Sequence, residues 1–190
     1  MIERMSARSR KLIELWRSDL GRSLVGDFVT QAVATYLVYG PQRNALGLYT
    51  LVLGRMGLGG EIGCGEKDAL RTLQRLSEEE FAYYDVKSET VWVPTMAASA
   101  FGVRMTIADN RVKGLKRTLE EYRHSPFFNE FVNWNADAYH LHGVEPSEVV
   151  WEGPLEEGLA NDEDRDESEE RLVEVLDWLK AGETEEALMA

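Results

Sequence analysis

The sequence has few of the residues that most often bind metal ions or form disulfides. Its 190 residues include one cysteine, Cys64, and three histidines. A single thiol excludes an internal disulfide and a zinc site built from several cysteines. His140 and His142 lie near Asp137, but no fourth ligand accompanies them at a spacing typical of a metal site. We therefore expect no bound metal ion.

Long apolar runs are absent as well. No stretch approaches the ~20 apolar residues that a membrane-spanning helix needs. The basic residues 1–11 are followed by a mixture of acidic, basic and aromatic residues, and not by the apolar core of a signal peptide. Hydrophobic residues make up 44% of the chain and charged residues 29%, as in soluble globular proteins. We expect a cytoplasmic protein with no membrane partner.

The motifs of common catalytic and cofactor sites are missing too. Residues 60–68 have the glycine spacing of a phosphate-binding loop, but Glu66 stands where the lysine should follow and no Ser or Thr comes next. No serine lies in a nucleophile-elbow motif. Cys64 lies among glycines, with no histidine close in the sequence. We expect no catalytic residue and no cofactor.

The net charge of −13 at pH 7 is distributed very unevenly along the chain. Residues 1–97 carry 12 basic and 12 acidic residues, and residues 98–144 carry 6 and 5. Residues 145–190 carry 3 basic and 17 acidic residues, so the acidity belongs to this tail. A neutral domain can still bind DNA when its cations share one face, because binding follows the local patch of charge.

Hydrophobic periodicity predicts an α+β fold that is mainly helical. The pattern gives, in order, a helix, a short strand, a weak glycine-rich helix, a strongly amphipathic helix and a β-hairpin. The ranges are 27–39, 45–51, 53–58, 66–80 and 81–94. In the first helix, Phe28, Ala32, Tyr36 and Tyr39 recur at helical spacing and predict the buried face, which Val29, Val33 and Leu37 widen. This order of elements is typical of a winged helix-turn-helix.

Four parts of the chain follow from these patterns: an N-terminal segment (1–23), a winged-helix DNA-binding domain (24–97), a helical extension (98–144) and an acidic tail (145–190). The extension contains predicted helices at 110–123 and 126–139. In the tail, an acidic linker at 161–170 precedes an amphipathic helix at 169–180. That helix could bind another protein, fold back on the domain or pair in a dimer. The tail could also cover the basic face and compete with DNA.

Several phrases of the sequence, taken in order, resemble a known family. Residues 36–44 contain Tyr-Leu-x-x-Gly-Pro-x-x-Asn, and residues 47–49 are Gly-Leu-Tyr on a predicted strand. Further matching phrases lie at residues 16–19, at 73–76 with 81–85 and 91–93, and at 111–116 with 125–131. Over about residues 12–140 the chain resembles phage replisome-organiser proteins. The resemblance implies a winged-helix domain that binds replication-origin DNA and helps recruit the helicase machinery.

The residues themselves suggest where DNA would bind. Lys67, Arg71 and Arg75 stand four apart on the 66–80 helix, opposite its leucines, and therefore form one stripe. Gln74 lies beside the stripe; glutamine can read adenine, as arginine can read guanine. An ordinary solvated helix face is the alternative interpretation, which the acidic residues one turn further on favour.

Other cations are candidates for contacts with the phosphate backbone. Lys87 lies in the predicted hairpin loop, and Arg43 lies in the turn before the first strand. Lys113 and Arg117 stand four apart on the predicted helix at 110–123. Pairing with nearby glutamates is the alternative for this last pair.

The leading hypothesis is a non-enzymatic protein of phage-type replication initiation that binds double-stranded DNA. A helicase or a helicase loader is a candidate partner through the C-terminal segment. The first alternative is a winged-helix transcriptional regulator, which is typically a dimer on a palindromic site, so the oligomeric state bears on the choice. The second is a protein-interaction module that uses the acidic tail and binds no DNA.

Overall fold

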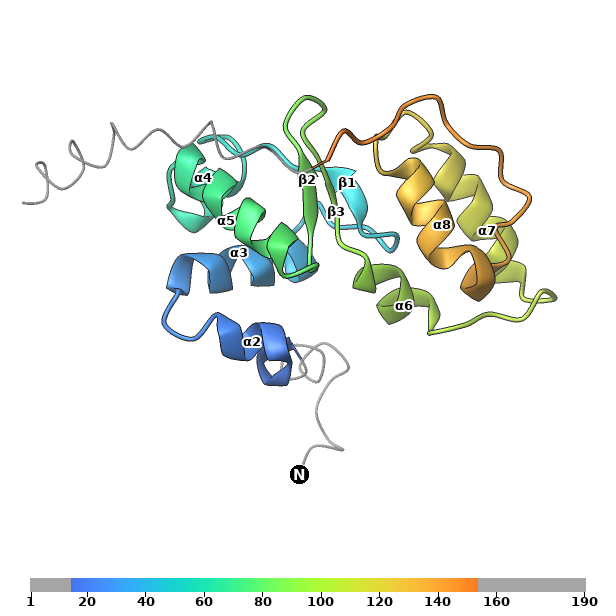
Figure 1. Cartoon of the computed structure of the whole chain (residues 1–190), viewed down its shortest axis with the longest axis horizontal. Coiled ribbons are helices and arrows are strands. Elements are labelled where there is room, and N and C mark those ends of the chain that lie inside the picture. The colour runs from blue at the N-terminus through green and yellow to red at the C-terminus, as the bar shows by residue number, and fades with distance from the viewer. Residues whose placement is uncertain (1–14, 154–190) are drawn as a thin grey trace, which may run out of the picture. The chain divides into compact units, whose positions relative to one another are not determined.

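The computed structural model describes residues 15–153 as a mixed α+β fold with a small antiparallel sheet (Figure 1). The elements are α2 (Asp19–Ser23), α3 (Phe28–Tyr39), β1 (Leu48–Thr50), α4 (Leu58–Ile62), α5 (Glu66–Glu78), β2 (Tyr83–Asp85), β3 (Thr90–Trp92), α6 (Thr95–Phe101), α7 (Asn110–Glu120) and α8 (Phe128–Tyr139). The predicted acidic linker at 161–170 and the predicted terminal helix at 169–180 lie outside the described residues.

The sheet has the strand order β1-β3-β2, with β3 paired antiparallel to both neighbours. Strands β2 and β3 form the predicted hairpin. Its register places Tyr49, Val91 and Tyr84 in one row across the sheet. Because successive side chains of a strand point to opposite faces, the row that contains Trp92 belongs to the other face.

Each face of the sheet is covered by its own group of helices. The face with Val91 packs into a cluster with Leu37 of α3 and Leu73 of α5. The face with Trp92 packs into a second cluster with Leu115 of α7 and Phe131 of α8. Figure 1 shows the sheet between these two groups. Leu46 and Leu48, from before the predicted domain boundary at residue 97, belong to the second cluster, so the 98–144 helices share a core with the preceding residues.

The predicted helices at 66–80, 110–123 and 126–139 are confirmed as α5, α7 and α8, with some ends shifted by a few residues. The apolar residues of α7 lie on its buried side, whereas Trp134 of α8, an apolar residue of that helix, is 64% exposed. In α7, Val112, Leu115 and Leu119 are 5%, 2% and 0% exposed. Asp109 caps this helix by accepting a hydrogen bond from the backbone N–H of Arg111.

The weak helix expected at 53–58 is wrong in position, because the helix that forms is α4 at Leu58–Ile62. Residues 52–57 form instead a loop that folds tightly under α4. The backbone N–H of Leu58 donates to the carbonyl of Val52 at 2.8 Å. A Cβ atom on Gly60 would lie 2.0 Å from the carbonyl oxygen of Arg55. The glycines therefore permit a close approach of two backbones, which hydrophobic periodicity does not reveal.

The buried face expected for α3 is right only in part, since Val33 and Leu37 are buried but the residues at its centre are not. The helix itself forms as predicted, with the Asp27 side chain capping it by accepting from the backbone N–H of Thr30. Its buried residues, however, are Thr30, Val33, Ala34 and Leu37. Phe28, which the spacing placed inward, is 78% exposed. Both sides of α3 are apolar, so periodicity alone could not choose between them.

Within residues 15–153, none of the helices combines the length and the apolar character that crossing a membrane requires.

Candidate nucleic-acid interface

The exposed side of α5 carries the first two of the predicted DNA-contact residues. The helix buries Ala69, Leu73 and Leu76 against the core cluster that it shares with α3. Lys67 and Arg71, four residues apart, are both exposed. Because buried positions recur every three or four residues along the helix, these two cations lie on the side turned away from the core.

Arg71 is held only weakly by its own chain. Its guanidinium lies 3.8 Å from the carboxylate of Asp68, one turn earlier, and the two side chains are 62% and 58% exposed. Solvent-exposed pairs of this kind contribute little free energy, typically below ~1 kcal/mol. Arg71 can therefore exchange Asp68 for a phosphate or a base edge at little cost.

Arg75, the third cation of the stripe, is engaged inside the protein. Its guanidinium lies 2.6 Å from the Asp27 carboxylate and donates a second hydrogen bond, of 3.1 Å, to the backbone carbonyl of Ser23. Both contacts tie the last turn of α5 to the chain just before α3. Gln74 is half-buried beside it. Contacts of these two residues with DNA stay predictions.

Asp27 joins the start of α3 to α5. One carboxylate oxygen accepts from the backbone N–H of Thr30 at 3.0 Å, and the other accepts from the Thr30 hydroxyl at 2.7 Å. Partial burial opposes ionisation of the carboxyl, but the Thr30 hydrogen bonds and the charge of Arg75 hold the pKa of Asp27 below its usual value. The carboxylate is thus fully charged near neutral pH, which favours the ion pair.

Lys87 lies in the hairpin loop, where it contacts Glu152. Asp85 shapes the loop by accepting from the backbone N–H and the hydroxyl of Ser88, at 2.8 and 2.7 Å. Lys87 forms an ion pair with Glu152, and their side chains are 76% and 74% exposed. The hydrogen bond and the charge of Glu152 raise the pKa of Lys87. A phosphate would compete with Glu152 for this ammonium group.

Arg43 is exposed in the turn between α3 and β1. Its neighbour Asn44 builds that turn, because its side-chain oxygen accepts from the backbone N–H groups of Leu46 and Leu48 at 3.0 and 3.2 Å. The Asn44 amide also donates to the Tyr122 hydroxyl at 2.8 Å, beyond the end of α7. The sequence pattern singled out the turn but gave no indication of this long-range contact.

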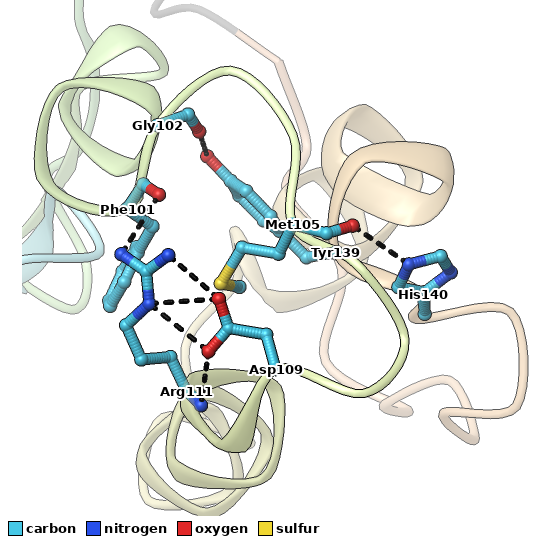
Figure 2. Close-up of polar contacts among 7 residues, drawn as sticks. All are labelled: Phe101, Gly102, Met105, Asp109, Arg111, Tyr139 and His140. Atoms are coloured by element: carbon cyan, nitrogen blue, oxygen red, sulfur yellow. Dashed lines mark hydrogen bonds and ion pairs between the residues drawn. The ribbon is translucent and has the colours of Figure 1, made fainter.

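Of the four cations of α7, one is held locally and the two predicted contact residues are not. Arg111 lies 2.7 Å from the Asp109 carboxylate and also donates to the carbonyl of Phe101 (Figure 2). Lys113 and Arg117 are exposed, and within residues 15–153 neither has an ion-pair partner. The nearby Glu120 pairs with Arg123.

The loop between α6 and α7 is fixed from the α8 side. The Tyr139 hydroxyl donates to the carbonyl of Gly102 at 2.9 Å, and the His140 ring nitrogen Nε2 lies 2.9 Å from the carbonyl of Met105 (Figure 2). His140, a residue considered for metal binding, thus holds a backbone carbonyl. Between residues 15 and 153 there is no group of three or more His, Cys, Asp and Glu residues that could hold a metal ion.

The predicted contact residues fall on two sides of the sheet. Lys67 and Arg71 belong to α5, which packs on the Val91 face. Lys113 and Arg117 belong to α7, which packs on the opposite face with Trp92. The structure therefore does not bring the two pairs together into one stripe.

Cys64 has the properties of an unreactive thiol. It is half-buried beside the α3–α5 core cluster. Burial, and secondly the charge of Asp68, raise the pKa of the thiol. The thiolate is the nucleophilic form, so a raised pKa leaves little of it near neutral pH.

Comparisons of the chain with protein-family models, with curated proteins and with solved structures found no match.

Proposed function

We propose that this chain is a non-enzymatic protein that binds double-stranded DNA through α5 and the hairpin that follows it. The order α3-β1-α4-α5-β2-β3, with a β1-β3-β2 sheet, is compatible with a winged helix and supports the proposal. In that fold the helix before the hairpin enters the major groove and the hairpin loop touches the flanking backbone. The observation that carries the proposal is that α5 buries Leu73 and Leu76 and turns Lys67 and Arg71 outward.

The charge of the domain is compatible with modest, salt-dependent binding. Phosphate contacts release counterions from DNA, so the logarithm of the affinity falls linearly with the logarithm of the salt concentration, by about 0.9 per contact. Lys67 and Arg71 would supply two contacts on α5, and Lys87 one more from the hairpin loop after leaving Glu152. Because these phosphate contacts are few, we expect the affinity for DNA to fall only gradually as the salt concentration rises.

The replication role is the more specific part of the proposal, and the resemblance of about residues 12–140 to phage replisome-organiser proteins supports it. The same resemblance indicates a helicase or a helicase loader as the protein partner. A gene for either protein next to the gene of this chain would support the role. Regulated operons next to the gene would instead favour the transcriptional regulator. A palindromic target site would favour it as well.

The decisive experiment is a fluorescence-anisotropy titration of the full chain with a generic duplex at several salt concentrations. We expect binding at ~50 mM salt, where phosphate contacts are strongest. Arg71→Ala should weaken it by about three- to tenfold and reduce the salt slope by about one. Arg104→Ala is the matched control, because it also removes one exposed cation, in the loop between α6 and α7. Equal effects of the two substitutions would refute the assignment of α5.

One observation favours the protein-interaction module as the second candidate. Arg75 and Lys87, two of the cations that a winged helix would offer to DNA, are paired with acidic residues of the chain itself. If no duplex binds at ~50 mM salt, where phosphate contacts are strongest, this module becomes the better description.

A further inference from the structure

The residues that follow α8 return across the second core cluster to the hairpin (Figure 1). Two anchors hold this segment, residues 145–152, which we call the strap. At the first anchor, the Ser147 backbone N–H donates to the Asn129 side-chain oxygen at 2.8 Å, and the Asn129 amide donates to the Ser147 carbonyl at 3.0 Å. The Ser147 hydroxyl also donates to the carbonyl of Arg123 at 2.7 Å. The first half of the strap is therefore fixed to α8 and to the turn before it.

The second anchor is the ring of Trp151. It packs against the rings of Phe127 and Tyr83, with 5.2 Å between the ring centroids in both pairs. Phe127 lies directly before α8 and Tyr83 lies on β2, so Trp151 joins the two elements. Buried aromatic area is the main favourable contribution to such contacts. Because Trp151 precedes Glu152 directly, the backbone at Glu152 is held beside the hairpin.

The strap places the carboxylate of Glu152 on the cation of the hairpin loop. Glu152 forms its ion pair with Lys87, which lies 65 residues earlier in the sequence. An exposed ion pair is usually weak, in part because two long side chains lose freedom when they are held together. Here the backbone of Glu152 is fixed beforehand, and this raises the effective concentration of its carboxylate at Lys87. An anion from outside has to compete with this carboxylate.

The position of Trp151 also carries an unfavourable contribution, which makes the strap displaceable. Within residues 15–153, the buried indole Nε1–H of Trp151 has no hydrogen-bond acceptor. A buried donor without an acceptor opposes docking, because the same N–H group bonds water when it is exposed. Val149 and Val150, between the two anchors, are 43% and 60% exposed and add little buried area. An anion that binds Lys87 can therefore displace Glu152.

We propose that the strap is an autoinhibitory element, in which the carboxylate of Glu152 occupies the position of a DNA phosphate on Lys87. The inference rests on the proposed DNA-binding function, since the contact that the strap blocks is that of the hairpin loop with the DNA backbone. A carboxylate and a phosphate both accept hydrogen bonds from an ammonium group, so one can replace the other. DNA and Glu152 then compete for Lys87, and each weakens the binding of the other.

Two substitutions in the strap of the full chain test this competition. Glu152→Gln frees Lys87 and should tighten the binding of a generic duplex by about two- to fivefold at ~50 mM salt. The salt slope should steepen by about 0.9, because a free lysine releases counterions from DNA, whereas a paired lysine only exchanges one anion for another. Glu148→Gln is the matched control. It removes the same charge from an exposed residue of the strap that has no ion-pair partner within residues 15–153, and should leave the slope unchanged.

Lys87→Gln provides the second arm of the experiment. In that background, Glu152→Gln should act no differently from Glu148→Gln, because the cation that it would free is gone. Fluorescence anisotropy at several salt concentrations measures all variants. Equal effects of Glu152→Gln and Glu148→Gln in the chain that keeps Lys87 overturn the proposal. An effect of Glu152→Gln that persists without Lys87 overturns it as well.

Asn129→Ala tests the first anchor, because it removes the side-chain hydrogen bonds to Ser147. It should give part of the gain in affinity seen with Glu152→Gln, and no further gain in the Glu152→Gln background. An affinity equal to that of the wild type would overturn the role of the strap. The proposed function fails separately: if neither the wild type nor Glu152→Gln binds duplex at ~50 mM salt, DNA binding itself is refuted. If the wild type binds and Glu152→Gln brings no gain, only the autoinhibition is refuted.

Discussion

α3 and α5 pack against each other, but they divide their residues between core and solvent in different ways. α5 has leucines on one side and Lys67 and Arg71 on the other. α3 has no charged residue, and Phe28 on its open side is as apolar as Leu37 on its buried side. Charged residues thus mark the solvent side of α5, whereas nothing in the sequence marks that of α3.

This difference teaches what a hydrophobic pattern can decide. Burying a charge costs far more than exposing an apolar group, so a stripe of cations fixes the orientation of a helix. On α3 the aromatic residues and the small aliphatic residues compete for the core. The side with Val33, Ala34 and Leu37 is buried, which lets α3 lie close to α5 and the sheet.

The largest expected effect separates the two sides of α3. Leu37→Ala should lower the free energy of unfolding by about 2–5 kcal/mol, because Leu37 is fully buried and the substitution leaves a cavity. Phe28→Ala, which removes a larger side chain, should cost less than about 1 kcal/mol, because Phe28 is largely exposed. Urea denaturation of both variants at low concentration gives the two values. Similar losses of free energy for the two variants would mean that Phe28 is buried as the spacing of the apolar residues predicted.

A second effect concerns α4, which contacts both helices. Gly60→Ala should destabilise the protein by about 1–3 kcal/mol, because the new Cβ would meet the carbonyl oxygen of Arg55 at 2.0 Å. Gly114→Ala is the matched control in α7, where a Cβ meets nothing within 4 Å. There alanine should stabilise the protein by about 0.5–1 kcal/mol through its helix propensity. Thermal unfolding of both variants measures the difference, and stabilisation by Gly60→Ala would contradict the close approach.

A smaller effect is expected at Asp27, which caps α3 and pairs with Arg75 of α5. Asp27→Ala removes both the cap of α3 and the partner of Arg75, and should cost about 1–2 kcal/mol. Asp27→Asn keeps a capping side chain and loses only the ion pair, which is partly exposed and therefore worth less than about 1 kcal/mol. The difference between the variants in urea denaturation measures the cap. If both cost the same, the ion pair is the dominant contribution.

Much of the fold could be predicted from the sequence, for physical reasons that differ between elements. The hairpin and helices α5, α7 and α8 follow from local periodicity and capping residues, as with Asp109 before α7. The position of α4 could not be predicted, because it depends on the backbone of residues 52–55 passing beneath Gly57 and Gly60. The open face of α3 could not be predicted either, since its two sides are equally apolar.

The candidate site was predictable only as far as single helices determine it. The exposure of Lys67 and Arg71 follows from the leucine stripe of α5. The pairing of Arg75 with Asp27 and of Lys87 with Glu152 does not, because the partners lie 48 and 65 residues away in the sequence. The separation of Lys113 and Arg117 from the α5 cations depends on α7 packing on the other face of the sheet.

The smallest expected effect is the pH dependence of the joint between α3 and α5. The pKa of Asp27 in the folded protein lies below its usual value, in spite of partial burial, owing to the Thr30 hydrogen bonds and the charge of Arg75. The unfolded chain therefore binds its proton at higher pH than the folded protein does. The resulting stabilisation is fully present above the unfolded pKa and is lost as the pH falls through the folded pKa.

Denaturation of the wild type and of Asp27→Asn at several pH values isolates this contribution. The difference in free energy of unfolding should be constant near neutral pH and should shrink as the pH falls below about 4. In an Arg75→Gln background the shrinkage should be smaller, because only the Thr30 hydrogen bonds then favour the charged carboxylate. A difference that stays constant down to low pH would show that the charge of Asp27 adds nothing to the stability of the folded protein, and that α3 and α5 are held together by their apolar contacts.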